Sequence, residues 1–272
     1  SLQNRFVAAE RCYRRALDLA PDYSTAAFAL GVISLKTGST AAAESFLDSA
    51  AAIGFDEAKV WYNRGILHQR RDEPNEALAA YGKAIRYRPD YVEPRYNSAL
   101  ILREQNRPEE ARRTLEEVLA LRPRYRKALL TLARLAIDRN EYSRAAQVIS
   151  RLLHMSPRDI DALYGQGKLL GLQGYDQQAL EVYRRIASLD RENPRVHYNI
   201  GVNLADLGRP NEARDAYMRA LISTPTIGRR GTTWAYISSV PSSTNEPSGS
   251  WYGQRRPTMN MSKADTIWPT RI

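Results

Sequence analysis

The chain has 272 residues and a net charge of +10, from 40 Lys and Arg against 30 Asp and Glu, which favours acidic partners. It contains no run of 18 apolar residues, and its first residues, SLQNRF, lack the apolar core of a signal peptide, so we expect neither a membrane span nor a signal sequence. Cys12 is the only cysteine, which excludes an internal disulfide framework and leaves the cellular compartment undecided.

The sequence repeats with a period of 34 residues. Counted from Ser24, position 20 of the repeat is always alanine, at Ala43, Ala77, Ala111, Ala145, Ala179 and Ala213, and Ala9 fits one period earlier. Position 8 is always small, at Gly31, Gly65, Ala99, Ala133, Gly167 and Gly201. A unit of this size cannot bury a core alone, so we expect one array of stacked units rather than two globular domains.

The period predicts the boundaries of the units. We expect a truncated repeat with only its second helix at 1–23, six full units at 24–57, 58–91, 92–125, 126–159, 160–193 and 194–227, and a tail at 228–272. Apolar residues recur twice at helical spacing in each unit, as in Trp61, Ile66 and Leu67 and then Leu78, Tyr81 and Ile85. Each unit is therefore predicted to be an antiparallel helix pair, which makes the chain all-α.

Turn signals separate these predicted helices. Position 15 carries residues that tolerate a left-handed backbone, namely Gly38, Asp72, Asn106, Asn140, Gly174 and Gly208. Prolines able to begin a helix follow two residues later at Pro74, Pro108 and Pro210. Between successive units the chain is expected to be interrupted at Pro89, Pro123, Pro157 and Pro225.

The small positions predict close packing. Gly65 and Ala77 should lie where the two helices of one unit cross, and Ala84 where the next unit packs. Trp61 and Tyr81 should fill the remaining core, so Trp61→Ala is expected to destabilise the fold by about 3–5 kcal/mol.

The series Trp61, Gly65, Ala77, Tyr81, Ala84, Pro89 resembles the signature of the tetratricopeptide repeat family, and the resemblance extends over about residues 1–225. It implies a right-handed α-solenoid in which the first helices of the units line a concave groove. It also implies a role in binding other proteins, with no particular ligand.

The sequence predicts no catalytic or metal centre. His68 and His197 occupy positions where other units place packing residues, and His154 has no Cys or His partner at metal-binding spacing. The spacing of Gly165, Gly167 and Gly171 does not fit a dinucleotide-binding loop. We expect no cofactor and no enzymatic activity.

Positions 2, 5, 9, 12 and 13 of the first helices are expected to face the groove. Position 5 is aromatic in five of six units, with Tyr62, Tyr96, Tyr164 and Tyr198 among them, and position 6 carries Asn63, Asn97 and Asn199. These ladders suit peptide recognition, as asparagine ladders do in the repeat region of O-linked N-acetylglucosamine transferases. The alternatives are packing between units for the tyrosines and a hydrogen bond within the helix for the asparagines.

Charge changes along the predicted groove. Position 9 is apolar until Arg134 and Lys168, near which Arg103 and Lys127 add charge. We expect an acidic peptide with apolar residues to place its carboxylates against Arg134 and Lys168. Position 2 alternates in charge, at Lys59, Glu93, Lys127, Asp161 and Arg195, which predicts ion pairs between units. The clamp by which relatives bind chaperone tails is absent, because Tyr62 and Ile66 occupy its first two positions.

Nucleic acid is not the expected partner. Position 26 carries Arg15, Lys83, Arg151, Arg185 and Arg219, and residues 122–127 read RPRYRK. A solvated basic face is the simpler interpretation, and RNA binding through it is an alternative.

The tail has a different composition. Residues 226–272 contain 7 Ser, 7 Thr, 4 Gly and 4 Pro together with Trp234, Trp251 and Trp268, and no helical period, so we expect an irregular or disordered segment. Neither end of the array shows a polar capping helix, so we expect the ends to fray, to associate end to end or to dock onto further parts of a longer protein. The main alternative to an interaction scaffold is a substrate-selecting repeat region of a larger enzyme, such as a glycosyltransferase, whose catalytic domain lies elsewhere.

Overall fold

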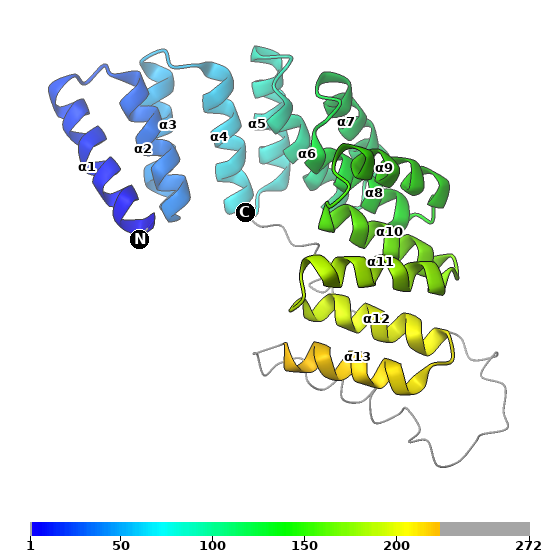
Figure 1. Ribbon diagram of the computed structural model, residues 1–272. Coiled ribbons are helices and arrows are strands. Elements are labelled where there is room, and N and C mark those ends of the chain that lie inside the picture. The colour runs from blue at the N-terminus through cyan, green and yellow to red at the C-terminus, as the bar shows by residue number, and fades with distance from the viewer. Residues whose placement is uncertain (1, 224–272) are drawn as a thin grey trace. The chain divides into compact units, whose positions relative to one another are not determined.

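The computed structural model describes residues 2–223, with side chains from residue 5 onward. The described residues form helices only: α1 (Leu2–Leu19), α2 (Ser24–Thr37), α3 (Thr40–Ala52), α4 (Glu57–Arg70), α5 (Pro74–Tyr87), α6 (Val92–Glu104), α7 (Pro108–Leu121), α8 (Arg126–Asp138), α9 (Tyr142–Met155), α10 (Ile160–Leu172), α11 (Asp176–Leu189), α12 (Pro194–Asp206) and α13 (Pro210–Ile222). The predicted all-α architecture is confirmed (Figure 1). Pro225 and the predicted tail lie outside the described residues.

Consecutive helices pack as antiparallel pairs. The two helices of a pair contact each other across a short turn, as seen in α2–α3, α4–α5, α6–α7, α10–α11 and α12–α13. Second helices also contact the first helix of the next repeat, as α5 does with α6 and α11 with α12. Because each helix packs mainly on its neighbours in sequence, the architecture is that of an α-solenoid.

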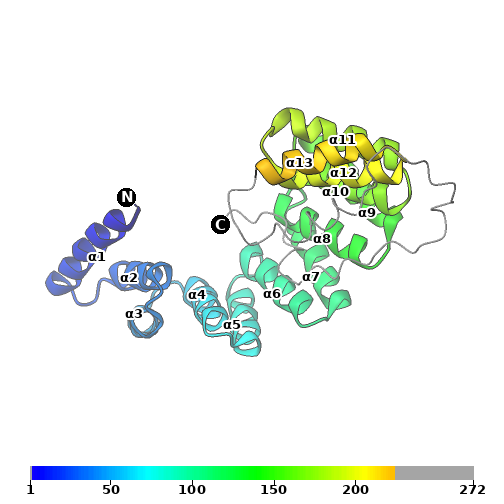
Figure 2. The same cartoon turned by 90° about the horizontal axis from the view of Figure 1, so that it is seen from below.

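Contacts divide the chain into two compact units, Ser1–Ala128 and Leu129–Ile272. The division falls inside α8, so α1 to α7 belong to the first unit and α9 to α13 to the second. In the first unit, helices α2 to α5 follow one another in chain order (Figure 2). Each unit therefore holds a core of its own.

The predicted turn residues adopt the left-handed backbone that their types allow. Positive φ angles occur at Gly38 (86°), Asp72 (59°), Asn106 (58°), Asn140 (59°), Gly174 (80°) and Gly208 (70°). Pro74, Pro108 and Pro210 begin α5, α7 and α13, as the spacing predicts. One further left-handed glycine, Gly54 (φ 80°), lies in the connection that has Phe55 in place of proline; the connection with Arg191 also lacks proline.

The small residue at position 8 lies against the side chain at position 24 of the same helix pair. A Cβ atom on Gly65 would be 2.4 Å from Cε1 of Tyr81, and one on Gly201 would be 2.5 Å from Cε1 of Tyr217. Where position 8 is alanine, position 24 is a smaller aliphatic residue, as in Ala99 with Leu115. The two positions therefore exchange volume in these pairs, whereas in the α2–α3 pair Gly31 lies against Leu47.

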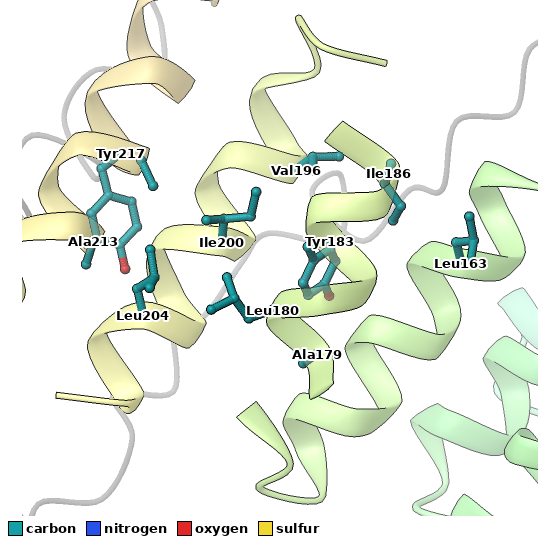
Figure 3. Packing of buried hydrophobic residues seen from close by; sticks show 11 residues of the cluster. Leu163, Ala179, Leu180, Tyr183, Ile186, Val196, Ile200, Leu204, Ala213 and Tyr217 are labelled. Atoms are coloured by element: carbon teal, nitrogen blue, oxygen red, sulfur yellow. The ribbon is translucent and has the colours of Figure 1, made fainter. Parts of the chain in front are cut away.

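The core of the second unit shows how these positions fill space. Tyr183 and Tyr217 are buried together with aliphatic residues of α10 to α13 (Figure 3). The surrounding side chains include Leu163, Ala179, Leu180, Ile186, Val196, Ile200, Leu204 and Ala213. Because these helices bury apolar side chains against both neighbouring helices, the adjacent pairs share one hydrophobic cluster.

Trp61 differs from the prediction. Tyr81 is fully buried as expected, but Trp61 is only half-buried. The guanidinium carbon of Arg64 and the Nζ atom of Lys83 lie 4.5 Å and 3.8 Å from the Trp61 ring centroid. Cations replace core side chains around this ring, because it lies at the edge of the α4–α5 pair. The cost of Trp61→Ala should therefore fall below the about 3 kcal/mol typical of a buried aromatic residue.

We expect Gly65→Ala to lower the free energy of unfolding by about 1–3 kcal/mol, because the added methyl group overlaps the Tyr81 ring. Chemical denaturation of the purified chain measures this change. Adding Tyr81→Leu should recover part of the loss, because it recreates the pairing of Ala99 with Leu115.

Gly82→Ala is the matched control. Gly82 lies on α5 and has open space around its Cα, so the same substitution should stabilise the helix by about 0.5–1 kcal/mol. Equal effects of the two substitutions would contradict the packing described for position 8.

Candidate functional site

The residues predicted to line a groove lie on first helices of both units. In the first unit they are Tyr62 and Asn63 on α4, Tyr96, Asn97 and Arg103 on α6, and Lys127 at the start of α8. In the second unit they are Arg134 on α8, Tyr164 and Lys168 on α10, and Tyr198 and Asn199 on α12. The structure thus provides two sets of candidate residues, one for each unit.

Within each unit, positions 5 and 9 of the first helices share a solvent-accessible face. Tyr62 and Ile66 on α4 are half-buried, and so are Tyr164 and Lys168 on α10. The next residue along, at position 10, is fully buried, as Leu67 shows. We call the side chains at positions 5 and 9 the first-helix face. Of the predicted candidates, Tyr62, Tyr96, Arg134, Tyr164, Lys168 and Tyr198 lie on this face.

The tyrosine and asparagine ladders are joined by hydrogen bonds between neighbouring repeats. Tyr62 is hydrogen-bonded to Asn97 of the next repeat. Asn97 Nδ2 also donates to the hydroxyl of Tyr81, at 3.2 Å. In the second unit, Asn199 Nδ2 donates to the Tyr164 hydroxyl. These contacts show that the ladders tie repeats together.

Aromatic packing holds the tyrosines of the first-helix face in place. The ring centroids of Tyr164 and Tyr183 are 5.6 Å apart, and those of Tyr198 and Tyr217 are also 5.6 Å apart. In the first unit, the Tyr62 and Tyr96 rings pack on two residues of the inter-repeat loops that sequence reasoning missed, Tyr91 at 5.2 Å and Tyr125 at 5.5 Å. Both loop tyrosines occupy position 34, where other units have Glu57, Asp159 and Asn193, so the only signal in the sequence was tyrosine at this position in two successive units.

Two amides lie inside the repeat structure. Asn63 is buried, and its Nδ2 donates to the backbone oxygen of Lys59 at 2.9 Å. Asn203, which sequence reasoning did not select, is buried and donates to the backbone oxygen of Asn199 at 2.7 Å. Both side chains satisfy a helix carbonyl rather than face solvent.

The cations of the two units have different surroundings. In the second unit, Arg134 and Lys168 are half-buried, and Lys168 Nζ lies 3.9 Å from Asp138 Oδ1, at the limit of an ion pair. In the first unit, Arg103 is half-buried and Lys127 is exposed. Arg134 and Lys168 therefore place two positive charges on the first-helix face of one unit.

Two charged residues predicted to pair along position 2, Lys59 and Glu93, contact residues of the inter-repeat loops instead. Glu93 Oε1 accepts from Arg122 at 2.8 Å, and Lys59 Nζ lies 3.6 Å from Asp56. Asp56 also accepts from Arg88 and from the backbone of Lys59, and these bonds hold the pKa of its carboxyl below the usual value in spite of burial. The loops thus neutralise part of the charge next to the first-helix face.

The described residues contain no arrangement of His, Cys, Asp and Glu that could hold a metal ion. His68 Nδ1 lies 2.7 Å from Glu73 Oε2, and His197 Nε2 lies 2.8 Å from the backbone oxygen of Arg191. Both histidines are half-buried at the boundary of the repeats. None of the helices in residues 2–223 combines the length and apolarity needed to cross a membrane.

The packing of the tyrosines predicts that the fold loses stability at alkaline pH. Burial raises the pKa of the Tyr91 hydroxyl to about 12 and also raises the pKa of Tyr62. The unfolded chain ionises first, at about pH 10, so folding stability is retained below that pH and lost as the pH rises toward 12. We expect the thermal midpoint to fall over this range, and to fall less steeply in Tyr91→Phe.

Tyr87→Phe serves as the control, because Tyr87 is 58% exposed and outside the tyrosine ladder. Its midpoint should follow that of the wild type across the same pH series. Identical slopes for the wild type and Tyr91→Phe would contradict the role given to Tyr91.

One curated relative and two solved structures illustrate what the chain is similar to. Protein O-mannosyl-transferase TMTC3 of Homo sapiens is 30% identical over 90 residues, which are 33% of this chain and 10% of that protein. The chain thus spans about a tenth of that relative's length. A tetratricopeptide repeat protein from Parabacteroides merdae aligns with a TM-score of 0.60 and 18% identity, over 88% of this chain and 91% of its own.

A second solved structure shares the fold. YrrB, described as a TPR protein with an unusual peptide-binding site, aligns with a TM-score of 0.54 and 20% identity, over 66% of this chain and 92% of its own. Three family models described as tetratricopeptide repeat match residues 3–57 and 169–226, 58–91, and 102–169. With the helix pairs, turns and small positions described above, these matches show that the chain belongs to the tetratricopeptide repeat family.

Proposed function

We propose that the chain is a non-enzymatic interaction scaffold that binds a segment of a partner protein on the first-helix face of its second unit. The observation that carries the proposal is the pair Arg134 and Lys168. Position 9 is Val, Ile or Leu in the other four repeats, so packing does not require a cation there. Their half-buried charges are suited to carboxylates of a bound segment.

The surroundings of these two cations indicate a partner with both acidic and apolar residues. Tyr164 and Tyr198 are held rigidly by Tyr183 and Tyr217, and Val202 continues position 9 as an apolar side chain. Rigid aromatic rings lose little entropy on binding, which favours them at interfaces. YrrB, which has the same fold, is described as having a peptide-binding site, and this supports the same class of ligand here.

We expect Lys168→Glu to weaken the binding of an acidic partner segment by about tenfold or more, because an attraction becomes a repulsion. The partner is first captured with the intact chain, and its affinity is then measured by titration calorimetry. Arg184→Glu is the matched control, because Arg184 is exposed on the second helix α11 and changes the net charge equally. Tyr96→Ala tests the candidates of the first unit in the same way. Wild-type affinity in Lys168→Glu would overturn the assignment to the second unit, and a loss confined to Tyr96→Ala would move the site to the first unit.

A second candidate function is suggested by the similarity to TMTC3. If this chain is part of a longer enzyme of that kind, the same face would select substrates for a catalytic domain elsewhere. Coding sequence on either side of these residues distinguishes the two functions, because only the second requires a transferase domain.

End-to-end self-association is also proposed. Val7 and Leu19 on α1 are 50% and 73% exposed, and Ile222 on α13 is 79% exposed. Because exposed apolar residues favour association, sedimentation velocity should show a mass that rises with concentration. Leu19→Glu should suppress that rise, and a constant monomer mass in the wild type would refute the proposal.

A further inference from the structure

A shallow pocket of about 300 Å³ lies on the α4–α5 pair of the first unit. It is lined by Trp61, Lys83, Arg86 and Tyr87, and no residue of the first-helix face contributes to it. Lys83 and Arg64 contact the Trp61 ring, as described above, and Tyr87 is 58% exposed. We call this site the Trp61 pocket. It combines two aromatic rings with accessible positive charge.

Three of the four lining residues depart from the repeat at this one place. Elsewhere position 4 is Ala, Arg, Leu or His, and only this repeat has tryptophan there, at Trp61. Arg86 corresponds to Ala52 and Ala120 in the neighbouring repeats, and Tyr87 corresponds to aliphatic residues. Because the other repeats build the same helix pair without these residues, the fold does not require them.

The charge of the Trp61 pocket is largely uncompensated. Arg64 Nη2 lies 2.6 Å from Asp48 Oδ1 and is neutralised. In the part of the chain that the structure describes, Lys83 contacts Trp61 and forms no ion pair, and Arg86 forms none either. A cation lying against an aromatic ring keeps its charge while part of its hydration shell is removed, which prepares it for an anion.

We propose that the Trp61 pocket binds an acidic segment of a partner protein in which an apolar side chain lies between carboxylates. The apolar side chain fits the hollow beside Trp61 and Tyr87. One carboxylate binds the ammonium group of Lys83, and another accepts two hydrogen bonds from the guanidinium of Arg86. This site is separate from the first-helix face and does not depend on the function proposed for it.

Two observations favour an acidic protein segment over a nucleic acid. The residues equivalent to Lys83 in the adjacent repeats are Ser49 and Glu117, so the positive patch is one repeat wide and a long phosphate backbone would meet a carboxylate. In addition, Lys83 and Arg64 already lie against the Trp61 ring, where a base would have to stack. A short carboxylate-bearing segment meets neither obstacle.

The fluorescence of Trp61 tests the proposal directly. In the full chain with Trp234, Trp251 and Trp268 replaced by phenylalanine, Trp61 is the only tryptophan. The probe is the acetylated peptide Glu-Asp-Leu-Asp-Glu, and the control peptide is Gln-Asn-Leu-Asn-Gln. We expect a saturable change in Trp61 emission with the acidic peptide, weakened by added salt, and no change with the neutral one.

Variants locate the binding site. The double variant Lys83→Glu with Arg86→Glu should weaken binding of the acidic peptide by about tenfold or more. The double variant Lys83→Gln with Arg86→Gln keeps the apolar parts of both side chains and should weaken binding less. It therefore controls for a loss of binding that is caused by unfolding. Arg113→Glu reverses one charge on the exposed surface of α7 and should have no effect on the affinity. Lys168→Glu should also leave the Trp61 signal unchanged, which separates this site from the first-helix face.

The proposal is overturned if the wild-type signal is absent at about 1 mM peptide, or if the double Glu variant retains wild-type affinity while folded by circular dichroism. It is also overturned if a fifteen-residue oligothymidine binds the Trp61 pocket more tightly than the acidic peptide does. Loss of the signal in Lys168→Glu alone would assign the peptide to the first-helix face instead.

Discussion

The close approach of two helices at position 8 governs the rest of this structure. At Gly65, Gly167 and Gly201 the absence of a side chain lets a tyrosine ring of the second helix lie directly against the first helix. The ring then fills the space that the missing side chain leaves between the two helices. Where the glycine becomes alanine, the ring becomes leucine or isoleucine, so the distance between helices is kept by a balance of volumes.

The same tyrosines connect packing within a repeat to contacts between repeats. Tyr81 is buried against Gly65, and its hydroxyl accepts from Asn97 of the following repeat while it donates to Gln69. Side chains that resemble a ligand-binding ladder in the sequence thus also form hydrogen bonds between adjacent helix pairs. The repeats of this chain therefore differ from one another mainly in residues that these contacts do not need, chiefly charges and the aromatic residues of the Trp61 pocket.

Several features of the fold followed from residue types alone because their causes are local. Asp72, Asn106 and Asn140 mark left-handed turns, since few side chains tolerate that backbone. Other features depended on distant contacts. Trp61 matched the packing pattern of a core residue, yet it lies beside Lys83 and Arg64, and no local rule places those cations over its ring. Likewise, Asn63 and Asn97 occupy the same repeat position, and only their neighbours decide that one bonds its own helix and the other a tyrosine.

The sequence by itself determined the helical repeat, its turns and the family, because each rests on steric preferences that recur every 34 residues. The tertiary structure decided which of the recurring side chains remain accessible. Accessibility depends on how neighbouring helix pairs meet, and a tyrosine at position 5 has the same local sequence pattern whether its ring packs on a loop, as Tyr62 does on Tyr91, or faces solvent. Only the packed helices separate the residues that hold repeats together from those free to meet a partner.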